Sequence, residues 1–362
     1  MFSESYRPTI PTHPRVTIHE KPQPLDFPAI KKAFQTFEDL KILIVGDVMI
    51  DSYIWGSVDR VSPEAPIPIV GIHNQERRLG GAANVALNIK AMGATPLLCS
   101  VIGDDNRKED FIDLLNEEGL SDIGIIIDDT RMTTVKTRII SERQHLLRVD
   151  EEIVYPLSPD TENLFDNQIT DLLKTGNIDA VIFQDYDKGV LTSTLIRSII
   201  ATANELGIPT LADPKYRNFL EYEKVTLFKP NFKEFLIGLN LSMVKSDYKR
   251  IHEESKLYLH DQLSIGRVMI TLSELGVFFS TSKGYYHLPA EIRDVADVSG
   301  AGDTVISVAG LCIATGLDDE SIAAVSNLAG GLVCEKVGVV PVDKQELLGE
   351  CVRVSKNNSQ SK

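Results

Sequence analysis

Short apolar runs rich in β-branched residues alternate with helical runs along most of this chain. The first clear strand pattern covers residues 41–45, and helical patterns at 81–92 and 106–118 flank a second strand pattern at 97–102. Strands separated by helices indicate βαβ units and a mainly parallel sheet. The same alternation continues with predicted strands at 179–184, 208–212, 225–228 and 267–272, and predicted helices at 191–205, 231–238 and 245–261. We therefore predict an α/β fold.

Two stretches break this alternation. Residues 52–75 are strand-like, contain three prolines and show no helical pattern, and residues 123–149 contain two or three strand patterns, of which 133–140 is the clearest. Neither stretch fits a βαβ unit. We predict that the two form a small antiparallel sheet that stands off the main domain, where it can cover a ligand site as a lid. The alternative is a surface hairpin without a role in function.

The two ends of the chain differ from its middle. Residues 1 to about 25 contain five prolines and few apolar clusters, which is typical of an extended arm or a disordered tail. A short helix is predicted at 29–38. We therefore expect a partly disordered N-terminal extension at 1–38, one domain at 39–352 and a disordered tail at 353–362.

Composition excludes several classes of protein. The formal net charge of −15 argues against a nucleic-acid or anionic-membrane surface. Apolar stretches stay well below the roughly 20 residues of a membrane span, and the N-terminus lacks a signal-peptide pattern. The four cysteines are far apart, which fits the reducing cytoplasm. The seven histidines show no metal-binding spacing, and we expect His252 and His260 to be exposed on a polar helix.

The run Asp297–Thr304 (DVSGAGDT) is the strongest functional signal. Its small residues allow a tight turn before a helix, where unpaired N–H groups and the helix dipole bind anions. Asp303 then lies beside the bound anion as a proton acceptor, which suits phosphoryl transfer from a nucleotide to a hydroxyl. The alternative is a tight connection with an aspartate that complements the dipole.

Three segments in order resemble the ribokinase-like family of carbohydrate kinases: Gly80–Ala86 (GGAANVA), Lys229–Glu234 (KPNFKE) and Asp297–Thr304. This resemblance implies a three-layer α/β sandwich with a β lid and ATP-dependent phosphorylation of a sugar. A narrower resemblance, to bacterial kinases that phosphorylate D-glycero-β-D-manno-heptose 7-phosphate at O1, rests on residues 46–51, 62–68, 136–138, 147–150, 185–189 and 212–215.

The narrower resemblance places the chain in ADP-heptose synthesis for lipopolysaccharide. Many kinases of that group are fused to a nucleotidyltransferase. The second domain's His-x-Gly-His motif does not occur here, so the resemblance implies a kinase alone, with a separate nucleotidyltransferase acting later. We also expect a homodimer formed through the lid, because the edges of a small sheet are open to pairing.

The family resemblance assigns roles to individual residues. Asp303 is the catalytic base, and the backbone N–H groups of Gly300, Ala301 and Gly302 form an anion hole. Sugar binding is assigned to Asp51, Gly80, Gly81, Asn84 and Asp185. The substrate's own phosphate needs cations, for which the candidates are Lys136, Arg138, Lys188 and Lys215, with Arg77, Arg78 and Arg148 as further choices. Each of these basic residues alone is more often a solvated surface charge.

The nucleotide side is assigned in the same way. Asn231 and Glu234 are three residues apart at a helix start, and the family uses such a pair to hold Mg²⁺ through water. The alternative is a helix-capping pair. Thr271, Ser273, Gly276 and Asn327 are expected to line the nucleotide. Asp297 and Ser299, with the Lys336–Gly338 turn, are candidates for a monovalent-cation site such as one for K⁺.

Three other functions stay open at this point. The same fold and chemistry could serve another sugar, sugar phosphate or nucleoside. A catalytically silent family member would bind a ligand without turnover, although the intact Asp303 and glycine turn argue against it. A nicotinamide enzyme is the weakest alternative, because no G-x-G-x-x-G follows the first strand.

Overall fold

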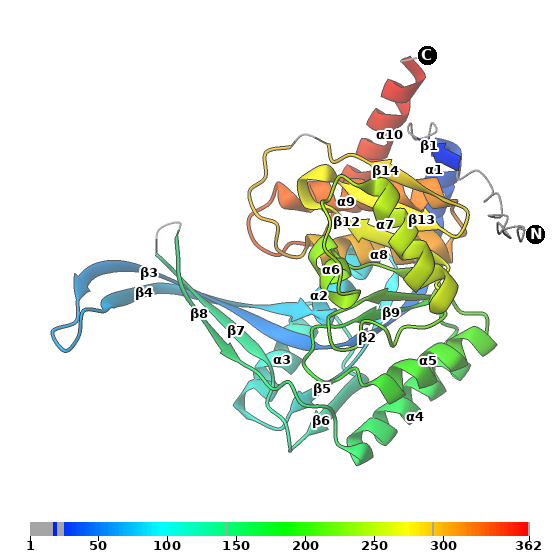
Figure 1. Ribbon diagram of the computed structural model, residues 1–362. Coiled ribbons are helices and arrows are strands. Elements are labelled where there is room, and N and C mark those ends of the chain that lie inside the picture. The colour runs from blue at the N-terminus through cyan, green and yellow to red at the C-terminus, as the bar shows by residue number, and fades with distance from the viewer. Residues whose placement is uncertain (1–16, 20–24, 142–143, 292, 361–362) are drawn as a thin grey trace, which may run out of the picture.

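The computed structural model describes residues 17–19, 25–141, 144–291 and 293–360 (Figure 1). Within them, one ten-stranded sheet forms the middle of the molecule. Neighbouring strands are parallel except where β13 pairs with β12 and with β14. The order across the sheet is β1 (Thr17–His19), β14 (Gly284–Leu288), β13 (Val277–Thr281), β12 (Arg267–Thr271), β11 (Leu227–Phe228), β10 (Thr210–Asp213), β9 (Ala180–Gln184), β2 (Lys41–Gly46), β5 (Thr95–Gly103) and β6 (Gly124–Asp128).

Helices cover both faces of this sheet, because its central strands are apolar on both sides. On β2, Ile42 and Ile44 belong to one hydrophobic core, and Leu43 and Val45 belong to the other. The first core is covered by α1 (Phe27–Thr36), α2 (Ala82–Ala91), α3 (Asn106–Glu117), α8 (Ala301–Ala314), α9 (Asp319–Cys334) and α10 (Lys344–Gln360). The second is covered by α4 (Pro159–Thr175), α5 (Ser193–Glu205), α6 (Phe232–Gly238) and α7 (Tyr248–Glu254). The predicted α/β sandwich is confirmed.

A second, four-stranded sheet projects from the main body (Figure 1). Its order is β4 (Pro68–Gly81), β3 (Val48–Val61), β7 (Val135–Ser141) and β8 (Gln144–Glu151). The β3–β4 and β7–β8 pairs are antiparallel, as expected for the lid. The central β3–β7 pair is parallel, so the lid is antiparallel only in its two hairpins.

The second lid segment begins later than the sequence pattern predicted. Residues 124–128, placed in the lid by that pattern, form β6 and pair in parallel with β5 at the edge of the main sheet. Their alternate side chains explain this placement, because Ile125 packs against one hydrophobic core and Ile126 against the other.

Residues 27–39 and 344–360, near the two ends of the chain, are more ordered than predicted. Phe34 of α1 and Phe37 of the following 3₁₀ turn (Phe37–Asp39) are buried, so residues placed in the N-terminal extension belong to the domain core. At the other end, α10 reaches Gln360 and includes much of the expected disordered tail. Buried Leu347 and Cys351 anchor α10, and an anchored helix extends at little further cost. The expected disorder at 1–16 lies outside the described residues.

The predicted helix at 245–261 also differs in detail. It consists of α7 followed by a π-helical segment, Ser255–Gln262. Both histidines expected to be exposed are buried: His252 lies against Tyr285, and His260 bonds to the Ile265 carbonyl and the Ser280 hydroxyl, both at 2.8 Å. Burial lowers the pKa of His252 to about 4. Among the described helices, none is long and apolar enough to cross a membrane.

Candidate active site

The glycine turn of the sequence motif forms the start of α8. Gly300 has a positive φ of 79° and immediately precedes the helix. A side chain there would be strained, and its Cβ would approach the Asn84 amide nitrogen to 3.0 Å. The first-turn N–H groups of a helix have no acceptor within the helix, which is the basis of the predicted anion site, and that of Ala301 is bonded to the Val298 carbonyl at 3.4 Å.

The carboxylate of Asp303 lies in this first turn and is nearly fully buried. It accepts hydrogen bonds from three side chains. The Asn84 amide donates to Oδ2 at 2.7 Å, the Gln184 amide donates to Oδ1 at 3.0 Å, and the Tyr186 hydroxyl donates to Oδ1 at 2.8 Å. Burial raises the pKa of Asp303 to about 6 against the lowering effect of these hydrogen bonds. The group is therefore a carboxylate whose pKa lies close to neutral pH.

Three consecutive parallel strands end beside Asp303. Gln184 ends β9, Asp213 ends β10 and Lys229 follows β11. The buried Lys229 ammonium pairs with Asp213 at 2.9 Å, and the Gln184 amide also donates to Asp213 at 3.3 Å. Ligands of open α/β sheets bind at the carboxyl ends of strands, and these polar side chains gather at that edge. The sequence analysis assigned no role to Gln184, Tyr186, Asp213 or Lys229, although their position at strand ends was a usable signal.

The residues predicted to bind sugar are mostly brought together at the base of the lid. Asp51 of β3 is buried and pairs with Arg138 of β7 at 2.5 Å. A Cβ on Gly80 would lie 2.3 Å from the Asp51 carboxylate, so any larger residue there would displace this carboxylate. Gly81 precedes α2 with a φ of 62°, and α2 then directs Asn84 toward Asp303. These four predicted residues are buried, and they lie where the lid strands and α2 meet.

Asp185 does not join this group. Its buried carboxylate accepts from the Asp187 N–H at 2.8 Å, the Asn218 amide at 3.1 Å and the Tyr222 hydroxyl at 2.9 Å. These bonds hold the turn that follows β9 and leave the carboxylate turned into the protein. Asp47 fixes the same turn by accepting from three backbone N–H groups, those of Tyr186, Lys188 and Val190.

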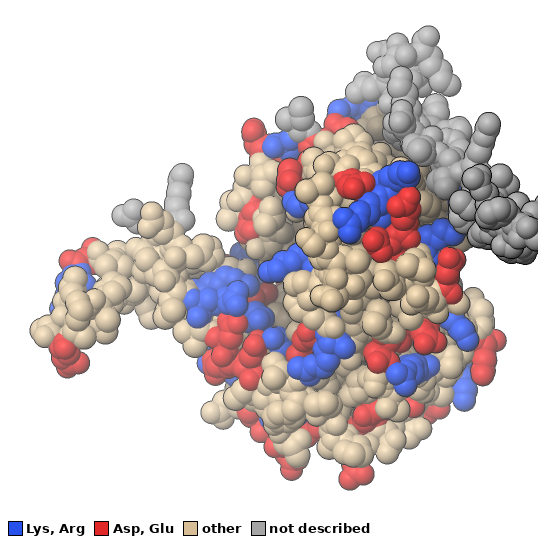
Figure 2. Space-filling model, in the orientation of Figure 1, with Lys and Arg blue, Asp and Glu red and all other residues tan. Residues whose placement is uncertain are grey.

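Every cation proposed for the substrate phosphate is paired with an acid. The interleaving of basic and acidic side chains where the lid meets the main body is visible in Figure 2. The pairs are Lys136 with Glu152 and Asp150, Lys188 with Glu152, Arg138 with Asp51, Lys215 with Glu234, Arg148 with Asp150, Arg77 with Asp110, and Arg78 with Glu76. The ammonium groups of Lys136 and Lys188 share a single oxygen, Glu152 Oε2, at 3.2 and 2.9 Å. Two lysine ammonium groups therefore contact the same carboxylate oxygen.

On the nucleotide side, Asn231 and Glu234 form a reciprocal capping box at the start of α6. Each side chain accepts from the other residue's backbone N–H at 2.8 Å. The capping alternative is therefore present, and it leaves the second Glu234 oxygen to pair with Lys215. Asn231 also forms a β-bridge with Thr271.

The other predicted nucleotide residues lie along the adjoining loops. Ser273 and Gly276 have positive φ values, 56° and 86°, in the turn between β12 and β13. A Cβ on Gly276 would lie 2.5 Å from the Ala290 N. Asn327 of α9 donates to the neighbouring Pro289 carbonyl at 3.0 Å. The predicted nucleotide residues thus lie along the loops that join Asn231, the β12–β13 turn and Asn327.

The residues proposed for a monovalent cation connect two loops. Asp297 accepts from the Ser299 N–H at 2.9 Å and from the Gly338 N–H at 3.1 Å. Both predicted segments are therefore adjacent. The described residues include no cluster of three or more His, Cys, Asp or Glu side chains suited to a metal ion.

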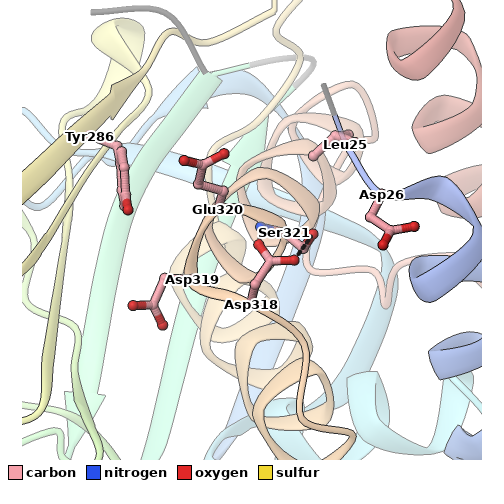
Figure 3. Close-up of a pocket in the computed structure, with 7 residues that line it drawn as sticks. All are labelled: Leu25, Asp26, Tyr286, Asp318, Asp319, Glu320 and Ser321. Carbon is pink, nitrogen blue, oxygen red and sulfur yellow. Dashed lines mark hydrogen bonds between the residues drawn. The ribbon is translucent and has the colours of Figure 1, made fainter. Parts of the chain in front are cut away.

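A separate acidic pocket lies at the N-terminal end of α9 (Figure 3). Three of its four carboxylates have structural partners: Asp318 caps α9 through Ser321, Asp26 caps α1, and Asp319 pairs with Arg267 at 2.5 Å. Since α8 has 14 residues and α9 follows it, this pocket is about 20 Å from the glycine turn. It is not part of the site around Asp303.

Comparison with known proteins decides the family. The sequence model of the pfkB family of carbohydrate kinases matches residues 39–345 of this chain. The chain belongs to this family. It is a sugar kinase, and the resemblance predicted from the glycine motifs is confirmed.

Curated relatives of this pfkB kinase include the bifunctional protein HldE of Pelobacter propionicus, 34% identical over 339 residues that cover 93% of this chain and 68% of the relative. HldE of Helicobacter pylori strain 26695 is 38% identical over 307 residues, covering 85% of this chain and 66% of the relative. The chain thus spans about two thirds of the length of these relatives.

Solved structures share the fold of this kinase at low sequence identity. Phosphofructokinase-2 from Escherichia coli in complex with fructose-6-phosphate aligns with a TM-score of 0.69 and 17% identity, over 87% of this chain and 99% of that one. Ribokinase of Arabidopsis thaliana complexed with ribose and ATP aligns with a TM-score of 0.66 and 14% identity. The alignment covers 88% of this chain and 98% of the ribokinase chain.

The pH dependence of turnover tests the protonation state of Asp303 in this kinase. Its pKa of about 6 means that the carboxylate is ionised above that pH and protonated below it. Only the ionised form accepts a proton, so we expect kcat/KM to fall as pH drops through about 6. Asn84→Ala removes a bond that stabilises the ionised form, and its acid limb should move to higher pH.

The measurement is a pH–rate profile of the wild-type enzyme and the variants. Asn204→Ala is the matched control. It also removes one hydrogen bond donated by an asparagine amide, but at an exposed position that does not contact Asp303. Its profile should match that of the wild type. An acid limb at about 4, the ordinary range of an aspartate, would contradict the expected state of Asp303.

Proposed function

We propose that this kinase transfers the γ-phosphoryl group of ATP to O1 of D-glycero-β-D-manno-heptose 7-phosphate and forms the 1,7-bisphosphate. The single observation that carries phosphoryl transfer is the buried Asp303 carboxylate in the anion-binding first turn of α8. The heptose phosphate is favoured by the sequence segments that resemble bacterial heptose-phosphate kinases and by the HldE relatives.

In the proposed reaction, Asp303 accepts the proton of the O1 hydroxyl as that oxygen attacks the γ-phosphorus. The bond between the γ-phosphorus and the ADP oxygen breaks, and ADP leaves. The N–H groups of the turn Gly300–Gly302 stabilise the charge that develops on the transferred group. Lys229 and Lys215 lie at the same edge and add positive charge there.

Sugar kinases of this fold use ATP and a divalent metal. The oxygens of Asn231 and Glu234 match the hard donors that Mg²⁺ prefers, and Glu234 also pairs with Lys215. When bound, Mg²⁺ neutralises charge on the ATP phosphates. We propose that Glu234 and Asn231 hold it through water, while Thr271, Ser273, Gly276 and Asn327 line the nucleotide.

A potassium site is proposed at Asp297 and Ser299. Phosphofructokinase-2 from Escherichia coli has been solved in complex with potassium and aligns with this chain at a TM-score of 0.70 and 16% identity. In this chain Asp297 connects the loop before α8 to the Gly338 turn, so a cation bound there would act on the position of the anion-binding turn.

Substrate competition tests the proposed reaction directly. Purified enzyme with MgATP is assayed against the heptose 7-phosphate, fructose 6-phosphate, ribose and fructose, and the heptose 7-phosphate should have the highest kcat/KM. Asp303→Asn should reduce kcat by about 10²- to 10⁴-fold, because a positioned base contributes that much, while ATP binding is retained. A preference for an unphosphorylated sugar would favour the alternative of another acceptor. Turnover near the wild-type rate in Asp303→Asn would contradict its role as base.

The distal phosphate is proposed to bind Lys136 and Lys188, since a phosphate oxygen can take the place of Glu152 Oε2 between them. Hydrogen bonds to charged groups contribute about 1.5–3 kcal/mol, so Lys136→Ala and Lys188→Ala should each raise KM for the heptose 7-phosphate by about 10- to 100-fold. Glu152→Gln removes the competing negative charge and should lower this KM.

Steady-state kinetics with the heptose 7-phosphate and the unphosphorylated heptose measure this effect. Lys108→Ala, which also breaks a lysine ion pair but on the exposed face of α3, is the control and should leave KM unchanged. Equal losses with the phosphorylated and the unphosphorylated sugar would show that the two lysines do not contact the phosphate.

We propose that the kinase forms a homodimer through the lid. Exposed apolar side chains cluster on this sheet, among them Ile72 of β4 and Leu147 of β8, which are 61% and 57% exposed. A second copy would cover them and pair with the open edges of the sheet. Sedimentation at micromolar concentration should show a dimer that Ile72→Asp or Leu147→Asp converts to monomer. Leu206→Asp, at a similarly exposed position after α5, should stay dimeric, and a wild-type monomer would contradict the proposal.

A further inference from the structure

The two oxygens of the Asp303 carboxylate have different numbers of hydrogen-bond donors. The Gln184 amide and the Tyr186 hydroxyl both donate to Oδ1, which fills the two lone pairs of that oxygen. The Asn84 amide donates to Oδ2, and within the described residues no second side chain does so. A base receives a proton on an open lone pair, so Oδ2 is the oxygen at which the proton of an acceptor hydroxyl can arrive.

The Gln184 amide nitrogen lies between two carboxylates. It donates to Asp303 Oδ1 at 3.0 Å and to Asp213 Oδ2 at 3.3 Å, and an amide has two N–H groups for these two bonds. Asp213 Oδ2 also pairs with the buried Lys229 ammonium at 2.9 Å. The amide therefore joins the base to an ion pair at the ends of β10 and β11.

The oxygen of the same amide shows what the side chain is used for. Gln184 is 2% exposed, and its Oε1 is buried without a hydrogen bond to any described residue. A buried polar atom without a partner costs free energy of desolvation. Turning the amide over would place this oxygen against the carboxylates of Asp303 and Asp213, so the nitrogen must face them. The two hydrogen bonds of the side chain thus serve the site and not the folding of β9.

We propose that Gln184 is a positioning residue for the base: its amide fixes Oδ1 of Asp303 against the Asp213–Lys229 pair and so directs the open lone pair of Oδ2 toward the acceptor hydroxyl. The proton of that hydroxyl passes to Oδ2 as its oxygen bonds to the γ-phosphorus and the bond to the ADP oxygen breaks. The inference rests on the phosphoryl transfer proposed above and does not depend on which sugar is the acceptor.

The first test needs no turnover. The titration of the Asp303 carboxyl is followed by ¹³C NMR in the ligand-free enzyme, with Asp303→Asn used for assignment. Gln184→Met keeps an unbranched side chain and removes the donor to the ionised carboxylate, so the pKa of Asp303 should rise above its value of about 6. Gln184→Glu adds a third carboxyl group at this point and should raise the pKa further. An unshifted titration in Gln184→Met would overturn the proposal.

Other ionisable groups that face Asp303 are kept in both variants. They are Asp213, Lys229, Lys215 and Tyr186. The negative charge of Asp213 raises the pKa of Asp303, so Asp213→Asn should lower it, in the direction opposite to Gln184→Met. Shifts of the same sign in these two variants would indicate a general loosening of the site and would count against the proposal.

The second test separates positioning of the base from binding of the substrates. In Gln184→Met, kcat at a pH well above the titration of Asp303 should fall by about 10- to 100-fold, because a displaced catalytic group loses rate on that scale. KM for MgATP and for the preferred sugar should stay at their wild-type values. An unchanged kcat would contradict the proposal, as would a loss confined to KM.

Gln168→Met is the matched control. The Gln168 amide also donates a hydrogen bond, to the Ile123 carbonyl at 2.6 Å, and its Oε1 is likewise buried without a partner among the described residues, but the residue lies on α4. Both the titration of Asp303 and kcat should match the wild type in this variant.

The two proposals fail separately. A wild-type enzyme that phosphorylates none of the tested sugars contradicts the proposed function. The titration of Asp303 in the ligand-free Gln184→Met variant does not depend on turnover, so a shift there would still support the contact between Gln184 and the carboxylate.

Discussion

The site depends on one buried carboxylate held at the start of a helix. Asp303 lies in the first turn of α8, at the positive end of the helix dipole, and burial raises its pKa to about 6. Its three hydrogen-bond donors come from α2 and from the end of β9 and the turn after it. The two halves of the chain therefore meet at this side chain, and its geometry depends on the assembly of the sheet with α2 and α8.

Electrostatic balance is the second organising feature. Each cation proposed to bind phosphate has an acidic partner, which explains how a chain of net charge −15 holds several half-buried lysines and arginines. Glu152 pairs with two of these lysines, and Glu234 pairs with a third, so two acidic side chains hold three of the proposed phosphate-binding cations.

Local patterns predicted much of the fold. Strand 41–45, the helices near 82–91 and 106–117 and the glycine turn before α8 follow from residue periodicity and from turn chemistry, which act over a few residues. The predictions differ from the structure where tertiary packing determines the position of a segment. Residues 124–128 have the same strand pattern as the lid but join the main sheet, and His252 and His260 lie on a polar-looking segment that the sheet buries. These outcomes depend on partners that are distant in the chain.

The sequence by itself determined the α/β class, the glycine turn before α8 with Asp303, and the family, because these are encoded in contiguous motifs. The tertiary structure alone decided that Asp185 faces inward, that Tyr186 and Gln184 hold the base, and that Lys136 and Lys188 converge on one oxygen. Spacing along the chain cannot reveal these contacts, since each joins residues whose strands become neighbours only in the folded sheet. The direction of a polar side chain at a strand end is set by what packs against it.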